Sequence, residues 1–106
     1  MHTSALVLVR GGVASAKVLH ARRVAQEENR FVVDCDYIRR AGLDVEMVVK
    51  QLLRKGPVIV ADTFQRKADL VRLAALSSGT IVLEMQLGQL PPDWEAYPDA
   101  IPVMAP

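Results

Sequence analysis

The chain has 106 residues, of which 51% are apolar and 24% charged, and its formal net charge is +1. This composition excludes a disordered chain, and the small charge provides no overall field that would attract nucleic acid or an acidic membrane. The apolar run Ala5–Val9 is far too short to span a membrane. Cys35 is the one cysteine and cannot form an internal disulfide, so with no recognisable secretory signal we expect a cytoplasmic protein.

Strand-like and helix-like segments alternate from the N-terminus. Ala5–Arg10 is aliphatic without polar alternation, as expected of a strand buried on both faces of a parallel sheet. Gly11-Gly12 breaks this strand, and Ser15 is suited to the N-cap of a helix over about Ala16–Glu28. Asn29 is suited to the end of that helix.

The same alternation continues through the middle of the chain. The further predicted elements are a strand over Phe31–Tyr37, a helix over Asp44–Lys55 capped by Asp44, a strand over Val58–Asp62, a helix over about Arg66–Leu76 and a strand over Thr80–Leu87. Such an order predicts an α/β fold, with a mostly parallel sheet of four or five strands between two layers of helices.

The C-terminal segment differs in composition from the rest. Residues 88–106 hold five of the six prolines, and Ala100–Met104 is expected to add a short edge strand. We therefore divide the chain into an α/β domain over residues 1–87 and a proline-rich acidic tail over 88–106. Trp94 and Tyr97 in this tail are expected to pack on the sheet edge or on a partner, and we predict a homodimer or another protein partner.

Positive charge is confined to the other part of the chain. Every lysine and arginine lies between Arg10 and Arg72, and residues 73–106 carry acidic charges only. Basic pairs such as Arg39-Arg40 are interpreted as helix-surface charge, offset by nearby carboxylates, and not as a nucleic-acid patch. His2 and His20 lack the spacing of metal ligands.

Three clusters of polar residues follow predicted strands, at the edge of a parallel sheet where ligands bind. Asp34 and Asp36 lie in the acidic end of the second predicted strand, and Asp62 ends the third. After the first strand, Gly11–Lys17 has the layout G-x-x-x-x-G-K-[ST] of a phosphate-binding P-loop. Two letters differ, because Ala16 replaces the second glycine and Val18 replaces the magnesium-binding hydroxyl.

The blocks LVLVRGGVASAKVLHARRVA, FVVDCDYIRR and VIVADTFQRKADLVRLA resemble successive segments of the P-loop kinase superfamily, particularly its polynucleotide-kinase-like branch. The resemblance covers residues 5–87. It implies a phosphate-binding set of Gly11, Gly12, Ser15 and Lys17, and, if the chain is active, Asp36 as the substrate-activating base and Asp62 on the magnesium ion.

Further positions depart from the family pattern. Cys35 precedes Asp36 where the pattern has a second acid, Ile38 stands where arginine is usual, and Phe64 replaces a small polar residue.

The departures in the loop affect catalysis more than folding. An alanine in the backbone conformation of the second glycine costs on the order of 1–2 kcal/mol. Val18 removes a magnesium ligand. In the family, arginines of a lid segment follow the fourth strand, and such an arginine raises the rate by roughly three to five orders of magnitude. In this sequence no arginine or lysine follows Arg72.

We therefore predict a catalytically degenerate Walker A protein that works as a small binding or regulatory protein through protein–protein contacts. It requires no cofactor, and weak binding of phosphate, or of ATP with magnesium, is the most that the loop is expected to retain. One alternative is an active ATP-dependent kinase or NTPase of the polynucleotide-kinase type. Another is an unrelated flavodoxin-like interaction module.

Overall fold

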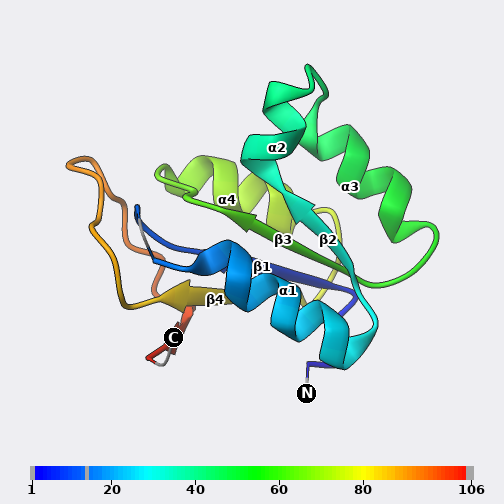
Figure 1. Cartoon of the computed structure of the whole chain (residues 1–106), viewed down its shortest axis with the longest axis horizontal. Helices are drawn as coiled ribbons and strands as arrows, with labels where there is room; N and C mark the ends of the chain where they lie inside the picture. The colour runs from blue at the N-terminus through cyan, green and yellow to red at the C-terminus, as the bar shows by residue number, and fades with distance from the viewer. Residues whose placement is uncertain (1, 14, 105–106) are drawn as a thin grey trace.

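The computed structural model describes residues 2–13 and 15–104. Within them a five-stranded sheet has the order β2-β3-β1-β4-β5, and every neighbouring pair of strands is parallel. The elements are β1 (Leu6–Arg10), α1 (Lys17–Glu28), β2 (Phe31–Asp34), α2 (Cys35–Arg40), α3 (Val45–Leu53), β3 (Val58–Asp62), α4 (Lys67–Ala74), β4 (Ile81–Met85) and β5 (Ile101–Val103). The predicted α/β class with a parallel sheet is confirmed (Figure 1).

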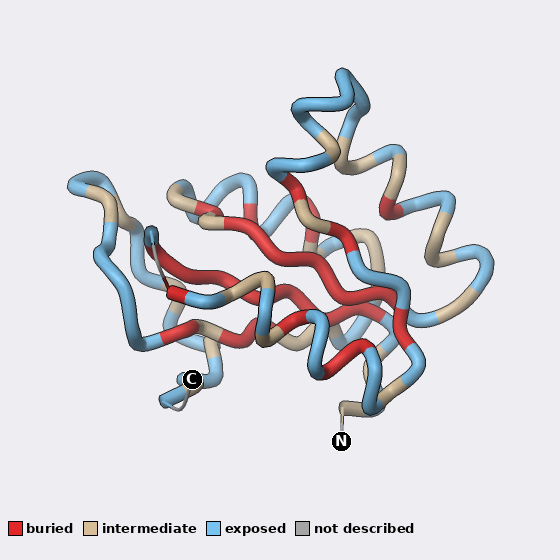
Figure 2. Tube along the Cα trace, viewed as in Figure 1, coloured by how far each residue is buried: buried red, intermediate tan, exposed pale blue. Residues whose placement is uncertain are grey.

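Helices cover both faces of the sheet. α1 packs on one face, where its buried residues Ala21, Val24 and Ala25 meet alternate residues of β1, β3 and β4. α3 and α4 pack on the other face, around a second cluster that includes Val49, Leu70 and Leu73. β1 and β3 are buried along their whole length, as the red central tube in Figure 2 shows. Their unbroken aliphatic sequence follows from this burial on two faces.

The second predicted strand is wrong at its C-terminal end. β2 stops at Asp34 and α2 begins at Cys35, so Asp36 and Tyr37 lie on a helix. The Asp34 carboxylate accepts a hydrogen bond from the Asp36 backbone N–H at 3.1 Å, and this N-cap starts the helix. The Asp34 cap therefore begins a helix at a point where the sequence pattern alone predicts that the strand continues.

Of the three residues predicted to cap or end a helix, two are confirmed. Asp44 caps α3 by accepting from the Met47 N–H at 3.0 Å, and Asn29 ends α1 in the left-handed conformation, with a φ of 55°. The third is wrong, because Ala16 and not Ser15 occupies the N-cap of α1 and no side chain caps that end.

The C-terminal segment returns to the sheet. β5 pairs in parallel with β4 and holds Pro102 on an edge strand. The connection from β4 to β5 runs past the loop that follows β1, and Figure 1 shows this connection in orange beside the blue loop. The described part of the chain has no helix long and apolar enough to cross a membrane.

Candidate functional site

The loop between β1 and α1 brings the predicted phosphate-binding residues together. Gly11 and Gly12 are buried directly after β1, and Ser15 is buried with 1% of its surface exposed. Lys17 is the first residue of α1, and its Nζ donates to the Gly12 carbonyl at 3.3 Å. Ala14 lies outside the described residues. The loop therefore has the strand–loop–helix placement that a P-loop requires.

Ala16 adopts the backbone conformation that the family pattern reserves for glycine. Its φ is 62° and its ψ is 25°, in the left-handed region. The Ala16 carbonyl accepts the first hydrogen bond of α1, from the His20 N–H at 3.0 Å. The expected backbone strain at this position is present, since a Cβ disfavours this region.

A second segment covers the loop, and we call Gly88–Leu90 the strap. Val13 and Gln89 form an antiparallel bridge in which each backbone N–H donates to the other residue's carbonyl at 2.9 Å. A Cβ added at Gly12 would collide with the Gln89 carbonyl oxygen. The Val13 N–H, which lies in this loop, is thus bonded to a peptide oxygen of the same chain.

The strap approaches the loop closely at Gly88 as well. Gly88 has a φ of 96°, and a Cβ there would lie 2.6 Å from the Val13 carbonyl oxygen and 2.8 Å from the Ser15 backbone nitrogen. Both the conformation and the space require glycine at this position. The strap is therefore packed against the loop with no room for a side chain at Gly88.

The two predicted acids are joined by an arginine. Arg39 of α2 donates two hydrogen bonds to Asp62, from Nη1 to Oδ1 at 3.1 Å and from Nη2 to Oδ2 at 2.5 Å. The same Nη1 lies 3.5 Å from the Oδ1 of Asp36. The hydrogen bonds to Asp62 raise the pKa of Arg39 against the effect of burial. Asp62, which the resemblance assigns to a magnesium ion, is held by a guanidinium instead.

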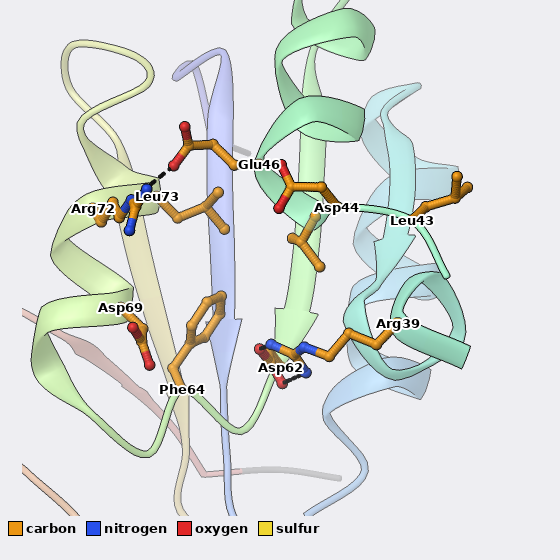
Figure 3. Close-up of a pocket in the computed structure, with 10 residues that line it drawn as sticks. Arg39, Leu43, Asp44, Glu46, Asp62, Phe64, Asp69, Arg72 and Leu73 are labelled. Atoms are coloured by element: carbon orange, nitrogen blue, oxygen red, sulfur yellow. Dashed lines mark hydrogen bonds and ion pairs between the residues drawn. The ribbon is translucent and has the colours of Figure 1, made fainter. Parts of the chain in front are cut away.

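A cavity of about 360 Å³ adjoins this ion pair, between α3 and α4 (Figure 3). Phe64 and Leu73 lie at its apolar floor. Glu46 of α3 accepts from the Arg72 Nε at 3.0 Å, and this pair links the two helices across the opening. The residues that line the cavity are Arg39, Leu43, Asp44, Val45, Glu46, Asp62, Phe64, Asp69, Arg72 and Leu73.

A buried arginine connects the end of β1 to the C-terminal segment. Arg10 is 0% exposed, and its Nε donates to the Phe64 carbonyl at 2.9 Å. Its Nη2 donates to the Glu95 carbonyl at 2.5 Å, and the Trp94 ring stacks on its guanidinium at 3.8 Å. Burial lowers the pKa of Arg10, opposed by the charge of Glu84.

The two tail aromatics therefore have contacts within the chain. Trp94 stacks on Arg10, and Tyr97 packs against the core cluster on the α3 and α4 face. These contacts fix the path of the connection across the carboxyl end of the sheet.

The residues present do not fit a P-loop magnesium ion. The Val18 side chain has no oxygen, and the Asp62 carboxylate is bonded to Arg39. Within residues 2–13 and 15–104, no group of three or more histidine, cysteine, aspartate or glutamate side chains is placed to hold a metal. Magnesium binding in proteins of this design needs both kinds of oxygen ligand.

Three features of the site were not foreseen from the sequence. Arg39 was interpreted as surface charge, although its i,i+3 spacing from Asp36 would have linked the two on a helix. Arg10 ends an otherwise aliphatic strand, and this position in the sequence would have indicated that its side chain is buried. No local pattern indicated that Gln89 pairs with Val13, because the two are far apart in sequence.

The comparisons with known proteins agree with the topology. The fold resembles a gluconokinase from Sinorhizobium meliloti 1021, with a TM-score of 0.67 and 12% identity over 97% of this chain and 83% of that one. It also resembles a sugar kinase from Janibacter sp. HTCC2649, with a TM-score of 0.63 and 14% identity over 92% and 82% of the two chains. No protein-family model and no curated protein matches the sequence.

The strand order and the loop after β1 define a parallel α/β protein with a loop at the N-terminus of its first helix. The likeness to the two kinases makes the chain P-loop kinase-like in fold. The flavodoxin-like alternative is wrong, since that class has the order 2-1-3-4-5, whereas β1 here lies between β3 and β4.

Proposed function

We propose that this chain is a catalytically degenerate P-loop kinase-like protein that binds other proteins and retains at most weak affinity for phosphate or nucleotide. The observation that carries the proposal is the strap, because the Gln89 carbonyl accepts a hydrogen bond from the Val13 N–H, within the loop whose backbone N–H groups would hold phosphate in a P-loop. A nucleotide would have to displace this backbone pairing before its phosphates could enter the loop.

The ionisable residues support the same proposal. Phosphoryl transfer depends on positioning and on neutralising charge with metal and cationic side chains. Val18 offers no metal ligand, and Arg39 neutralises the acid at the end of β3. The connection that follows β4, where the family has its lid arginines, carries neither arginine nor lysine. Each of these changes removes a contribution to the rate.

The test is a titration with ATP, with and without magnesium, followed by calorimetry and by an assay for ADP release. We expect a dissociation constant no tighter than about millimolar, no tightening by magnesium and no ADP release. Lys17→Ala is the matched control, because any residual binding through the loop should weaken in that variant. Magnesium-dependent binding together with Lys17-dependent ADP release would establish the active kinase alternative.

We also propose that the two changed positions of the loop contribute to the weak binding of nucleotide. The double variant Ala16→Gly with Val18→Thr restores both missing letters of the motif. It is expected to bind ATP more tightly with magnesium than without, whereas the parent chain shows no such difference. A double variant that folds and gains nothing would contradict descent of this loop from a working P-loop.

A further inference from the structure

The outer side of β2 carries backbone groups that no strand of the described chain pairs with. β2 lies at one end of the strand order, so β3 is its only neighbour within residues 2–13 and 15–104. The Phe31 N–H donates to the Pro57 carbonyl at 2.9 Å, so Phe31 directs its backbone groups toward β3. Because the residues of a strand alternate in this direction, Val32 directs its N–H and carbonyl away from β3. Val32 is 37% exposed, so another chain can reach these groups.

The side chains along this edge are apolar on both faces of the sheet. Phe31 is 41% exposed and shares a face with Val33, which belongs to the core cluster on the α3 side. Val32 lies on the opposite face, which α1 covers. No lysine or proline stands within β2, although these are the residues that commonly prevent an edge strand from pairing.

We propose that the partner of this edge is a second copy of the chain, which pairs antiparallel with β2 about a two-fold axis at Val32 and joins the two sheets into one. The inference rests on the proposed function, since it names a partner for the protein contacts proposed there. In this register the Val32 N–H of each copy donates to the Val32 carbonyl of the other copy. The Asp34 N–H of each copy faces the Arg30 carbonyl of the other in the same way.

The free backbone groups select this register. An axis at Phe31 needs the Arg30 N–H as a donor, but that N–H already donates to the Ala25 carbonyl at 2.9 Å. An axis at Val33 needs the Asp34 carbonyl, which as the N-cap of α2 accepts the first hydrogen bond of that helix. An axis at Asp34 places two carboxylates directly opposite each other, which is unfavourable.

The side chains select a second copy over an unrelated strand. With the axis at Val32, Phe31 of each copy lies across from Val33 of the other, and aromatic side chains pair favourably with β-branched ones. Asp34 lies across from Arg30, so the charges at the two ends of the strand are of opposite sign. β2 is therefore complementary to itself, as the shared surface of a two-fold dimer must be.

Hydrogen exchange of the unmodified protein, measured by NMR at rising protein concentration, tests the pairing. The Val32 amide is expected to exchange at least about tenfold more slowly once the dimer forms, because its N–H gains an acceptor. The Phe31 amide is the internal control, since it is bonded to Pro57 in the single chain and should change little. A Val32 amide whose exchange is independent of concentration overturns the proposal, and pairing with an unrelated strand gives this same result in the pure protein.

Disulfide cross-linking tests the register. In the proposed pair the two Val32 Cα atoms are about 5.5 Å apart, within the range that a disulfide spans. Phe31→Cys is the matched control for Val32→Cys, because Phe31 is equally exposed but lies across from Val33 and not from its own counterpart. Cys35 does not interfere, since it is fully buried and burial raises the pKa of its thiol.

Val32→Cys is expected to form the linked dimer at least about tenfold faster than Phe31→Cys under the same mild oxidant. Equal rates, or a faster reaction of Phe31→Cys, contradict an axis at Val32. If either variant fails to fold, the exchange experiment on the unmodified chain decides the question. Magnesium-dependent ADP release would refute the proposed function and leave both results standing, whereas a chain that stays monomeric refutes this inference alone.

Discussion

Ala16 is the residue at which the sequence and the fold conflict most directly. The turn into α1 needs a left-handed backbone, and Ala16 adopts it with a φ of 62°. The Cβ of an L-residue lies too close to the carbonyl oxygen in this region, at a cost of roughly 1–2 kcal/mol. The turn keeps this geometry because β1 and α1 on either side are fixed by their burial. Ala16 thus occupies a backbone conformation that suits glycine better than alanine.

We predict that Ala16→Gly raises the free energy of unfolding by about 1 kcal/mol, because glycine adopts this conformation without the steric cost. Urea denaturation of the two proteins measures the difference. Ala41→Gly is the control of opposite sign, since Ala41 is exposed and right-handed, with a φ of −77°, and should lose stability. Equal or lower stability of Ala16→Gly would show that the turn is not strained.

At the scale of elements, the end of α1 is tied to the N-terminal residues by a carboxylate. Glu28 accepts hydrogen bonds from the His2 backbone N–H at 2.9 Å and from the Arg30 Nε at 2.7 Å. Burial acts to raise the pKa of Glu28, but the bonds from His2 and Arg30 outweigh it and lower the pKa from 4.5 to about 2. The Glu28 carboxylate therefore joins the N-terminal segment to the C-terminal end of α1 and to Arg30, the residue before β2.

This lowered pKa predicts a pH dependence of stability. The unfolded chain takes up the Glu28 proton near pH 4.5, whereas the folded chain holds it off to about pH 2. The stabilisation by Glu28 is thus complete above about pH 4.5 and is lost as the pH falls toward 2. Unfolding free energies from urea titrations at several pH values should show a smaller decrease for Glu28→Gln over this window.

Glu27→Gln makes the same chemical change on a neighbouring exposed residue and serves as the control. A Glu28→Gln variant whose stability falls with pH as steeply as that of the parent chain would refute a role for this carboxylate.

At the scale of the whole molecule, the sheet has two edges of different character. β5 forms one edge and carries Pro102, which has no N–H to offer a further strand. β2 forms the other edge, where Phe31 is 41% and Val32 is 37% exposed. An unprotected edge strand with exposed apolar side chains is suited to pair with another chain. We therefore place the proposed protein contact at β2.

We predict that the protein self-associates through β2 and that Val32→Lys weakens this association at least about tenfold, because a charge on an edge strand opposes pairing. Sedimentation equilibrium over a range of concentrations measures the constant. Ile101→Lys on β5 is the matched control and should associate as the parent chain does. A chain that remains monomeric at all concentrations would contradict the prediction, as would equal weakening by both variants.

Much of the fold was predictable because its signals are local. The aliphatic runs of β1 and β3, the cap at Asp44 and the stop at Asn29 each depend on a few neighbouring residues. The extent of β2 was misjudged because the Asp34 cap competes with a strand pattern that continues past it. At the site, Gly11 and Lys17 were placed by the spacing of one motif.

Periodicity and turn chemistry act over short distances, so the alternation of elements, the parallel sheet and the loop at the start of α1 could be predicted from the residues alone. The sequence also shows that Ala16 and Val18 depart from the P-loop motif. The contacts that the loop makes, in contrast, depend on how distant segments pack in the folded chain. Gln89 reaches Val13, Trp94 reaches Arg10 and Arg39 reaches Asp62 through the packing of distant segments, and no local pattern encodes such contacts. The strap over the loop is a property of the folded chain as a whole.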